Sequence, residues 1–248
     1  MIVCKSPAEI EKMRRSGHAT RQILEEAKRL VRPGVSTLDL ERYVERRLRE
    51  MGAQPAFKGY RGYPCCMCTS VNDEIVHGIP SHRRLKEGDI ISLDLGVVMD
   101  GYYSDAAMTV PVGEISDSLK RLLRVTEESV ELAVQQARVG KRVGDISAAI
   151  QQHAEKNGFA VVRDLCGHGI GRQLHEEPQV PNFGRPGYGP ALKEGMVVAI
   201  EAMVNAGGYA MKVADDHWTA LTTDGSCSAH FEQVVAITRN GPDRLTQL

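Results

Sequence analysis

Five residues of this chain have the side-chain types and the settings that divalent metal ions need. Four are carboxylates and one is an imidazole: Asp94, Asp105, Glu201, Glu232 and His168. Asp94 lies within an apolar run, where an unpaired carboxylate is costly or has a shifted pKa. His168 lies in a glycine-rich run, residues 167–171, that permits close backbone approach. Because structural zinc sites prefer thiolates, this mixed oxygen and nitrogen set predicts a catalytic site for two divalent cations with bridging carboxylates.

An internal repeat puts two of these acids at equivalent positions. Leu-Lys-Glu-Gly occurs at residues 85–88 and again at 192–195, and each copy precedes an apolar run that ends in an acid, Asp94 or Glu201. Upstream, a second set of residues recurs at nearly the same offset: Arg32, Gly34, Asp39 and Gly52 match Arg138, Gly140, Asp145 and Gly158. Two units are too few for a solenoid. We expect one catalytic domain, residues 1–248, whose halves, about 1–112 and 113–248, bring the two acids together about a pseudo-twofold axis.

Composition restricts the class of protein. The chain has 248 residues, no linker-like segment and a net charge of −1, which gives no overall attraction to nucleic acid or membrane. The arginine-rich patches at residues 46–47 and 82–84 are interpreted as solvated faces, with docking to an RNA-rich assembly as the alternative. No apolar run approaches the ~20 residues of a membrane span, and residues 1–12 lack a signal-peptide core. The six cysteines are compatible with free thiols in a reducing compartment, so we expect a cytoplasmic, monomeric protein.

The elements that must position the five ligands follow from local signals. Ser6, Pro7 and Glu9 form a helix start, and helices are predicted over residues 7 to about 31, 37–51, 118–138 and 145–157. Strands 89–98 and 102–110 flank an Asp-Gly turn, strands 196–204 and 209–213 form a second predicted hairpin, and residues 233–238 are predicted to be the last strand. The pattern predicts an α+β fold with helices on one face of a mostly antiparallel sheet, which leaves the other face to solvent, a partner or an active site.

Several of these motifs together resemble the type I methionine aminopeptidases of the pita-bread metallopeptidase family. The motifs are residues 72–80, Asp94 with Asp105, residues 167–171, residues 175–178 and the surroundings of Glu201 and Glu232. The resemblance covers almost the whole chain, and the combination is highly specific. It implies the pita-bread fold, with two pseudo-symmetric halves on a curved sheet. It also implies removal of the N-terminal methionine from nascent proteins and peptides by two-metal-assisted hydrolysis, with a preference for a small second residue.

The resemblance also implies a role for each residue. Asp94 would chelate one metal, His168 and Glu201 the other, and Asp105 and Glu232 would bridge both; the ions could be Co, Mn, Fe or Zn. Glu201 would in addition act as general base. His175 would stabilise the oxyanion, and His77 would hydrogen-bond at or near the scissile amide nitrogen. The methionine pocket would consist of Tyr60, Tyr63, Cys68 and Trp218.

Three residues depart from a common form of the family pattern: Phe57, Leu174 and Ala202. They concern the shape of the pocket and remove no ligand. Transient ribosome contact is a further expectation. Two rival readings are an X-Pro aminopeptidase or prolidase of the same fold, and a non-catalytic, ribosome- or RNA-associated protein. The second should have lost ligands, whereas all five are present.

Overall fold

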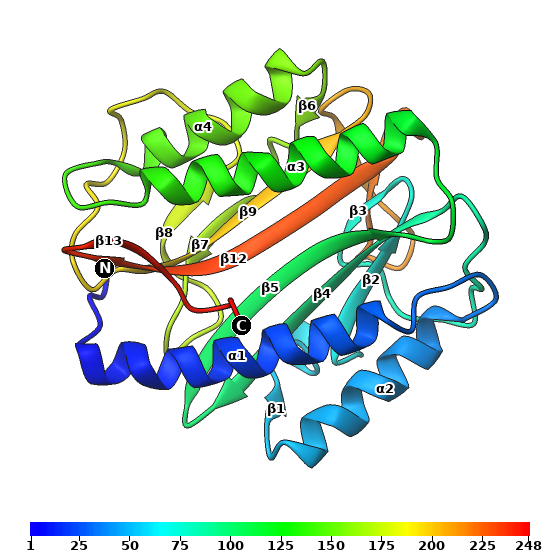
Figure 1. The fold of residues 1–248 in the computed structure, drawn as a ribbon, viewed down its shortest axis with the longest axis horizontal. Coiled ribbons are helices and arrows are strands. Elements are labelled where there is room, and N and C mark those ends of the chain that lie inside the picture. Colours follow the sequence, from blue (N-terminus) through cyan, green and yellow to red (C-terminus); the bar gives the residue numbers. More distant parts are fainter.

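The helices occur in two pairs, one in each half of the chain. The computed structural model describes residues 1–248, and Figure 1 shows both pairs. They are α1 (Pro7–Lys28) with α2 (Thr37–Glu50), and α3 (Asp117–Gln136) with α4 (Val143–Lys156). Ser6 caps α1, and the Glu9 carboxylate accepts from the Ser6 amide, as the predicted capping box requires. All four predicted helices are present, with ends that differ by up to a few residues.

The repeated residues upstream of the acids have the same structural role in both halves. Asp39 Oδ2 accepts from the Ser36 amide at 3.0 Å, and Asp145 Oδ2 accepts from the Arg142 amide at 2.8 Å. Each contact caps the N-terminus of the second helix of its pair. Gly34 and Gly140 both have a φ of +90° just before these helices. The sequence repeat therefore reflects two equivalent turn-to-helix junctions.

A ten-stranded sheet runs through both halves, and all of its strand pairs are antiparallel. Its main path is β1-β4-β5-β12-β9-β7-β8, with β2 beside β4, β6 beside β9 and β13 beside β12. The strands are β1 (Gln54–Pro55), β2 (Met67–Val71), β4 (Ile90–Met99), β5 (Tyr102–Pro111), β6 (Ala160–Val161), β7 (Cys166–Gly169), β8 (Glu176–Pro181), β9 (Val197–Asn205), β12 (Ser228–Thr238) and β13 (Gly241–Arg244). The β4–β5 pair of the first half is equivalent to the β9–β12 pair of the second, and β5 joins β12 at the centre.

One predicted hairpin is wrong. The segment after Gly208 does not return along β9; it forms β10 (Met211–Val213), which pairs with β11 (Ala220–Thr222) and through it with β3 (Glu74–Val76). The Gly208 amide donates to Asp224 Oδ2 at 2.7 Å, which holds the chain away from the main sheet. β10 is largely exposed, whereas β12 offers β9 a mostly buried partner. The predicted last strand is also corrected, since β12 begins at Ser228 and β13 follows it.

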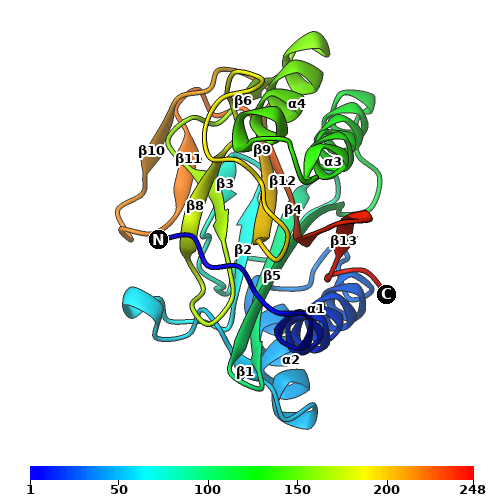
Figure 2. The ribbon, with the colours of Figure 1, turned by 90° about the vertical axis from the view of Figure 1, so that its left-hand side faces the viewer.

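The helices cover one face of the main sheet and leave the other to the site. Figure 2 shows α1, α2 and α3 on one side of the sheet and the small sheet, with β3, β10 and β11, on the other. In the first half, Leu93 and Leu95 pack with residues of α1 and α2; in the second, Ile200 and Ala202 pack with residues of α3 and α4. Since side chains alternate along a strand, Asp94 and Glu201 point to the uncovered face. A short 3₁₀ helix, η1 (Tyr60–Gly62), lies on the connection between β1 and β2.

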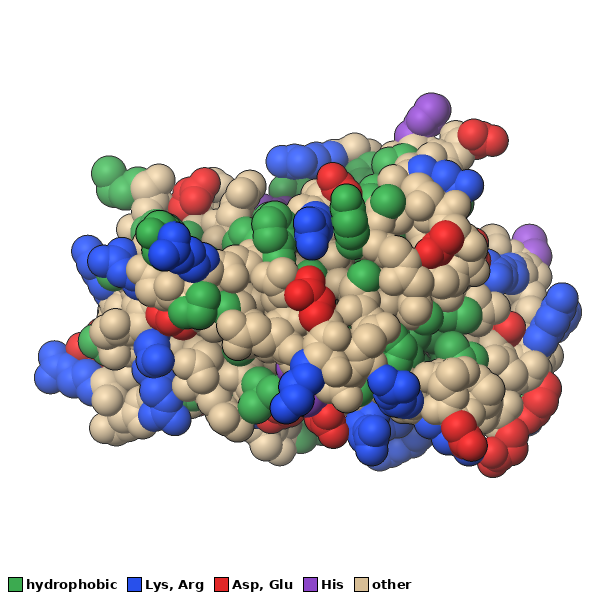
Figure 3. Space-filling view, turned by 90° about the horizontal axis from the view of Figure 1, so that it is seen from above, with side chains coloured by type: hydrophobic (Ala, Val, Ile, Leu, Met, Phe, Trp, Pro, Cys, Tyr) green, Lys and Arg blue, Asp and Glu red, His purple; other side chains and the backbone are tan.

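Charged side chains on the surface are interspersed. Figure 3 shows basic and acidic groups scattered together over the face seen from above. In the predicted arginine-rich patches, Arg47 Nε lies 2.7 Å from Glu26 Oε2, and Arg83 Nη1 lies 2.6 Å from Glu74 Oε1. These arginines are thus ion-paired within the chain. No helix combines the length and the apolar composition that crossing a membrane requires.

Glu41 provides a test of how α2 holds the strand that carries Cys68. Its buried carboxylate accepts from the amides of Cys66, at 2.7 Å, and Met67, at 3.1 Å. Glu41→Ala leaves two buried N–H groups without partners, so we expect it to lower the free energy of unfolding by about 2–4 kcal/mol in urea titrations. The control Glu45→Ala removes a half-exposed ion pair on the same helix and should cost less than about 1 kcal/mol. Equal losses for the two variants would contradict this account.

Candidate metal centre and active site

Strand register brings the predicted ligands together. Asp94 on β4 lies opposite Ala107 on β5, Ala107 lies opposite Glu232 on β12, and Glu232 lies opposite Glu201 on β9. Asp105 is two residues from Ala107 on β5, and His168 pairs with Ala199, two residues from Glu201. Because side chains two residues apart share a face, all five ligands lie on the uncovered face of the sheet.

Four of the five predicted ligands are buried, and three of the carboxylates have an oxygen without a partner. Asp94, Asp105, Glu232 and His168 are only 3–8% exposed. Asp94 Oδ1, Asp105 Oδ1 and Glu232 Oε1 have no hydrogen-bond partner, and single ligand atoms of Asp105, His168 and Glu232 all lie within 4.8 Å of one another. His168 Nδ1 is 2.9 Å from the Gly169 carbonyl, so an N–H donated there leaves Nε2 free as a ligand. Orphaned buried oxygens facing one imidazole fit a divalent cation.

The pKa shifts of the carboxyls show that this site disfavours uncompensated negative charge. Burial raises the pKa of Asp94 to about 7, and burial together with neighbouring acids raises the pKa of Asp105 and Glu232 well above the ordinary range. Burial also acts to raise the pKa of Glu201, but His230, His168 and His77 outweigh it, so the net shift is downward. The cluster therefore holds its full negative charge at neutral pH only when a cation compensates it.

Close backbone packing around His168 requires the glycines beside it. A Cβ at Gly167 would lie 2.4 Å from the Ala199 carbonyl oxygen, and one at Gly169 would lie 2.2 Å from the Glu177 carbonyl oxygen. Side chains at either position would push β7 away from β9 or β8 and move His168 with it. The predicted close approach at these glycines is present.

A cavity of about 190 Å³ adjoins the cluster, and every predicted site residue lines it. These residues are the five ligands with His77, His175, Tyr60, Tyr63, Cys68 and Trp218. The Tyr63 and Trp218 rings meet edge to face at 5.1 Å, and the Tyr63 hydroxyl donates to the Gly78 carbonyl at 3.0 Å. Two of the departing residues, Phe57 and Leu174, also line the cavity, whereas Ala202 belongs to the core beneath the helices.

The two histidines beside the cluster are held in neutral form. Desolvation lowers the pKa of His77, and desolvation with the nearby His168 lowers the pKa of His175 to about 4, although His175 keeps an exposed surface. His175 Nδ1 lies 2.7 Å from the Tyr60 hydroxyl. A hydroxyl that donates to Nδ1 selects the tautomer whose Nε2–H remains free to donate to a ligand.

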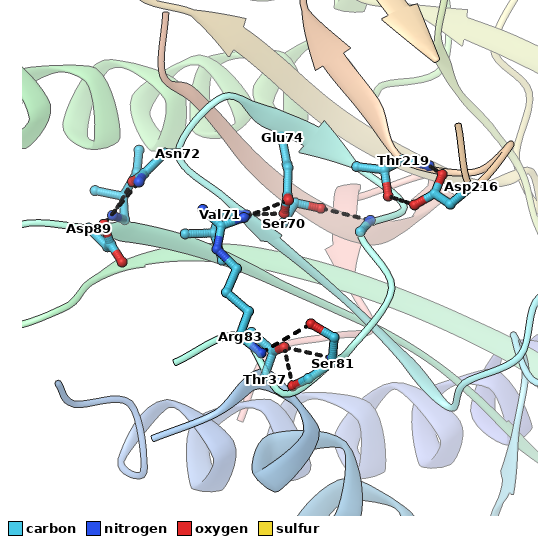
Figure 4. Close-up of polar contacts among 12 residues, drawn as sticks. Thr37, Ser70, Val71, Asn72, Glu74, Ser81, Arg83, Asp89, Asp216 and Thr219 are labelled. Atoms are coloured by element: carbon cyan, nitrogen blue, oxygen red, sulfur yellow. Dashed lines mark hydrogen bonds and ion pairs between the residues drawn. The ribbon is translucent and has the colours of Figure 1, made fainter. Parts of the chain in front are cut away.

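A polar network holds the turn that carries His77 (Figure 4). Glu74 accepts from the Val71 amide at 2.7 Å and from Arg83 at 2.6 Å, and the Gly78 amide donates to Ser70 Oγ at 3.1 Å. His77 itself has a φ of +62°, a conformation that such contacts must maintain. Because β3 also pairs with β11, the same turn is tied to the segment that carries Trp218.

His230 is a residue of the cavity wall that the sequence motifs did not identify. It is 2% exposed, and its Nε2 lies 3.5 Å from Glu201 Oε2. The signal that could have identified it is the period of two along β12, which places His230 on the same face as Glu232. Arg61 also lines the cavity, and an exposed arginine in a turn carries no comparable signal.

Comparisons with known proteins show the family to which the chain belongs. The profile of metallopeptidase family M24 matches residues 11–239. Methionine aminopeptidase of Clostridium perfringens is 51% identical over 246 residues, 99% of each chain, and methionine aminopeptidase 1 of Bacillus subtilis is 50% identical over 248 residues, all of each chain.

Solved structures confirm the predicted pita-bread fold. The structure of methionine aminopeptidase from Thermotoga maritima superposes with a TM-score of 0.99 at 47% identity and full coverage of both chains. A prolidase from Pyrococcus horikoshii has a TM-score of 0.81 at 24% identity, and this chain covers 64% of its length, so that likeness concerns the fold alone. The chain belongs to metallopeptidase family M24 and, within it, to the methionine aminopeptidases.

Proposed function

We propose that this protein is a metal-dependent aminopeptidase that removes the N-terminal methionine from peptides and newly made proteins. The observation that carries the proposal is a buried cluster of four carboxylates and one imidazole next to an aromatic-lined cavity. Identity of about half the residues to full-length methionine aminopeptidases supports the same activity. The preference for a small second residue rests on that similarity.

The ligands are proposed to hold two divalent ions. Asp94 would bind one, His168 and Glu201 the other, and Asp105 and Glu232 both, as the family resemblance implies. The orphaned oxygens of Asp94, Asp105 and Glu232 support metal binding by these three residues. Divalent ions in such a site act as Lewis acids that lower the pKa of water to near neutrality. Carboxylate and imidazole donors accept Co, Mn, Fe and Zn, so availability in the cell decides which ion is used.

Three residues of the chain are proposed to handle protons and charge. Glu201 has a pKa below the ordinary range, so it is ionised at neutral pH and can take a proton from the attacking water and deliver it to the leaving amine. His175 would donate Nε2–H to the oxyanion that develops at the scissile carbonyl. His77 would hydrogen-bond at or near the scissile amide nitrogen.

The cavity beside the cluster is proposed to bind the methionine side chain. Tyr60, Tyr63, Cys68 and Trp218 would form its wall, and aromatic edges attract a thioether. Burying such a side chain contributes about 1.5–3 kcal/mol. If the ions also bind the free α-amine of the substrate, only the first residue can be removed.

The remaining proposals concern the protein as a whole. One sheet containing strands of both halves supports a single catalytic domain over residues 1–248. We also propose a cytoplasmic monomer that meets nascent chains, with transient ribosome contact and no membrane or sequence-specific nucleic-acid binding, in line with a net charge of −1. The rivals are an X-Pro peptidase and a non-catalytic binding protein.

Hydrolysis of Met-Ala-Ser, beside an X-Pro peptide, tests the function directly. The protein is stripped with a chelator and then titrated with Co, Mn, Fe or Zn. We expect metal-restored release of free methionine and little cleavage of the X-Pro peptide. Cleavage of the X-Pro peptide alone would favour a prolidase activity. Cleavage of neither peptide with any metal would favour a binding protein.

The pKa shifts predict how pH acts on the metal-free protein. The Asp94 pKa rises from about 3.9 in the unfolded chain to about 7 in the folded chain, so its contribution to stability is present below about pH 4 and is lost as pH rises through about 7. Bound metal compensates the charge. In calorimetry, the gain in Tm on adding metal should therefore be larger at pH 8 than at pH 5. A gain in Tm that shrinks with rising pH would contradict this. In the metal-free protein, Asp94→Asn should weaken the loss of stability that accompanies rising pH.

The variant His175→Ala tests whether His175 binds metal or stabilises the oxyanion. Because His175 is proposed to stabilise the oxyanion and not to bind metal, the variant should keep its metal content while kcat falls by about 10²–10³-fold. Elemental analysis measures the metal content, and steady-state kinetics measure kcat. His168→Ala is the matched variant and should lose metal. Loss of metal from His175→Ala would refute the assignment.

A further inference from the structure

A second hollow adjoins the methionine cavity. It is a groove of about 680 Å³ that shares Arg61, His168 and His175 with the cavity. The rest of its lining comes from residues 1–9, from Tyr102 and from residues 166–179. If the methionine side chain fills the cavity, the rest of a bound peptide can extend past the three shared residues into this groove.

Only one of the lysine and arginine side chains that line the groove is without an ion pair. Lys5 Nζ lies 2.7 Å from Glu176 Oε2, and Arg172 Nη2 lies 3.5 Å from Glu9 Oε1. Arg61 makes no ion pair or side-chain hydrogen bond within the chain; its guanidinium lies 5.4 Å from the centre of the Tyr60 ring. The one acid of the groove without an ion pair, Glu177, does not line the cavity. Apart from the proposed metal ligands, the junction of the two hollows therefore carries one unpaired charged side chain, that of Arg61.

The alternation of side chains in an extended peptide relates this charge to a substrate position. Residues one and three of such a peptide point to the same side, about 6.8 Å apart. The first residue would point to the wall that contains Tyr60 and Tyr63, and Arg61 lies between them in η1. The side chain of the third substrate residue therefore points toward Arg61, while that of the small second residue points the opposite way.

We propose that the groove binds the substrate residues that follow the scissile bond, and that Arg61 pairs with an acidic side chain at the third position. The inference rests on the proposed aminopeptidase function and adds a specificity beyond the second residue. An exposed arginine and carboxylate attract each other weakly, so the effect is a preference of a few-fold that salt weakens.

The test compares kcat/KM for two amidated peptides, Met-Ala-Asp-Ser-Gly and Met-Ala-Asn-Ser-Gly, with the metal-loaded enzyme. Amidation removes the terminal carboxylate, and Asp and Asn differ mainly in charge. We expect the wild type to favour Asp about three- to fivefold at low ionic strength, and less at high salt. Arg61→Gln should reduce the ratio to about one, and Arg61→Lys should keep part of it. The control Arg163→Gln removes an exposed arginine that lines neither hollow and should leave the ratio unchanged.

The outcomes separate this inference from the function on which it rests. Methionine release from both peptides with no preference for Asp, or with a preference that survives in Arg61→Gln, overturns the Arg61 assignment and leaves the aminopeptidase function intact. No release from either peptide with any metal overturns both. A preference lost equally in Arg163→Gln would show a general effect of net charge and would also overturn the assignment.

Discussion

Mutual repulsion among four buried carboxylates is the constraint on which the rest of this structure depends. The β5–β12 and β9–β12 pairings bring acids from distant parts of the chain onto one face of one sheet. Such a face is stable only if protons or cations compensate the acids and if the strands are anchored elsewhere. The anchor is the opposite face, where Leu93 and Ile200 pack beneath the helices. The covered face thus supplies the apolar burial that the uncovered face lacks.

Pseudo-symmetry builds the carboxylate–imidazole cluster, and a departure from it contributes to the aromatic wall of the cavity beside it. The two halves contribute equivalent strand pairs, β4–β5 and β9–β12. The second half inserts β10 and β11 between β9 and β12, and β11 pairs with β3 of the first half. That pairing brings Trp218 to within 6.5 Å of His77, ring centre to ring centre. A strict duplication would leave no such aromatic wall.

The same burial acts in opposite directions on the two kinds of titrating group. It raises the pKa of Asp94, Asp105 and Glu232 and lowers the pKa of His77, because a buried group favours its neutral form. Glu201 differs because histidines, among them His230 at 3.5 Å, favour its charged form. One environment can therefore hold neutral imidazoles, one ionised carboxylate and acids that resist ionisation.

Local signals in the sequence determined the four helices, the hairpin at Asp100 and Gly101, and the residues that form the carboxylate–imidazole cluster. Capping, turn chemistry and an acid in an apolar run act within a few residues, so they can be interpreted without the fold. Only the tertiary structure decided that β9 pairs with β12, that His230 faces Glu201 and that Arg61 stands where two hollows meet. Strand register and the free charge of a surface residue depend on segments far apart in the chain, whose contacts local patterns do not encode.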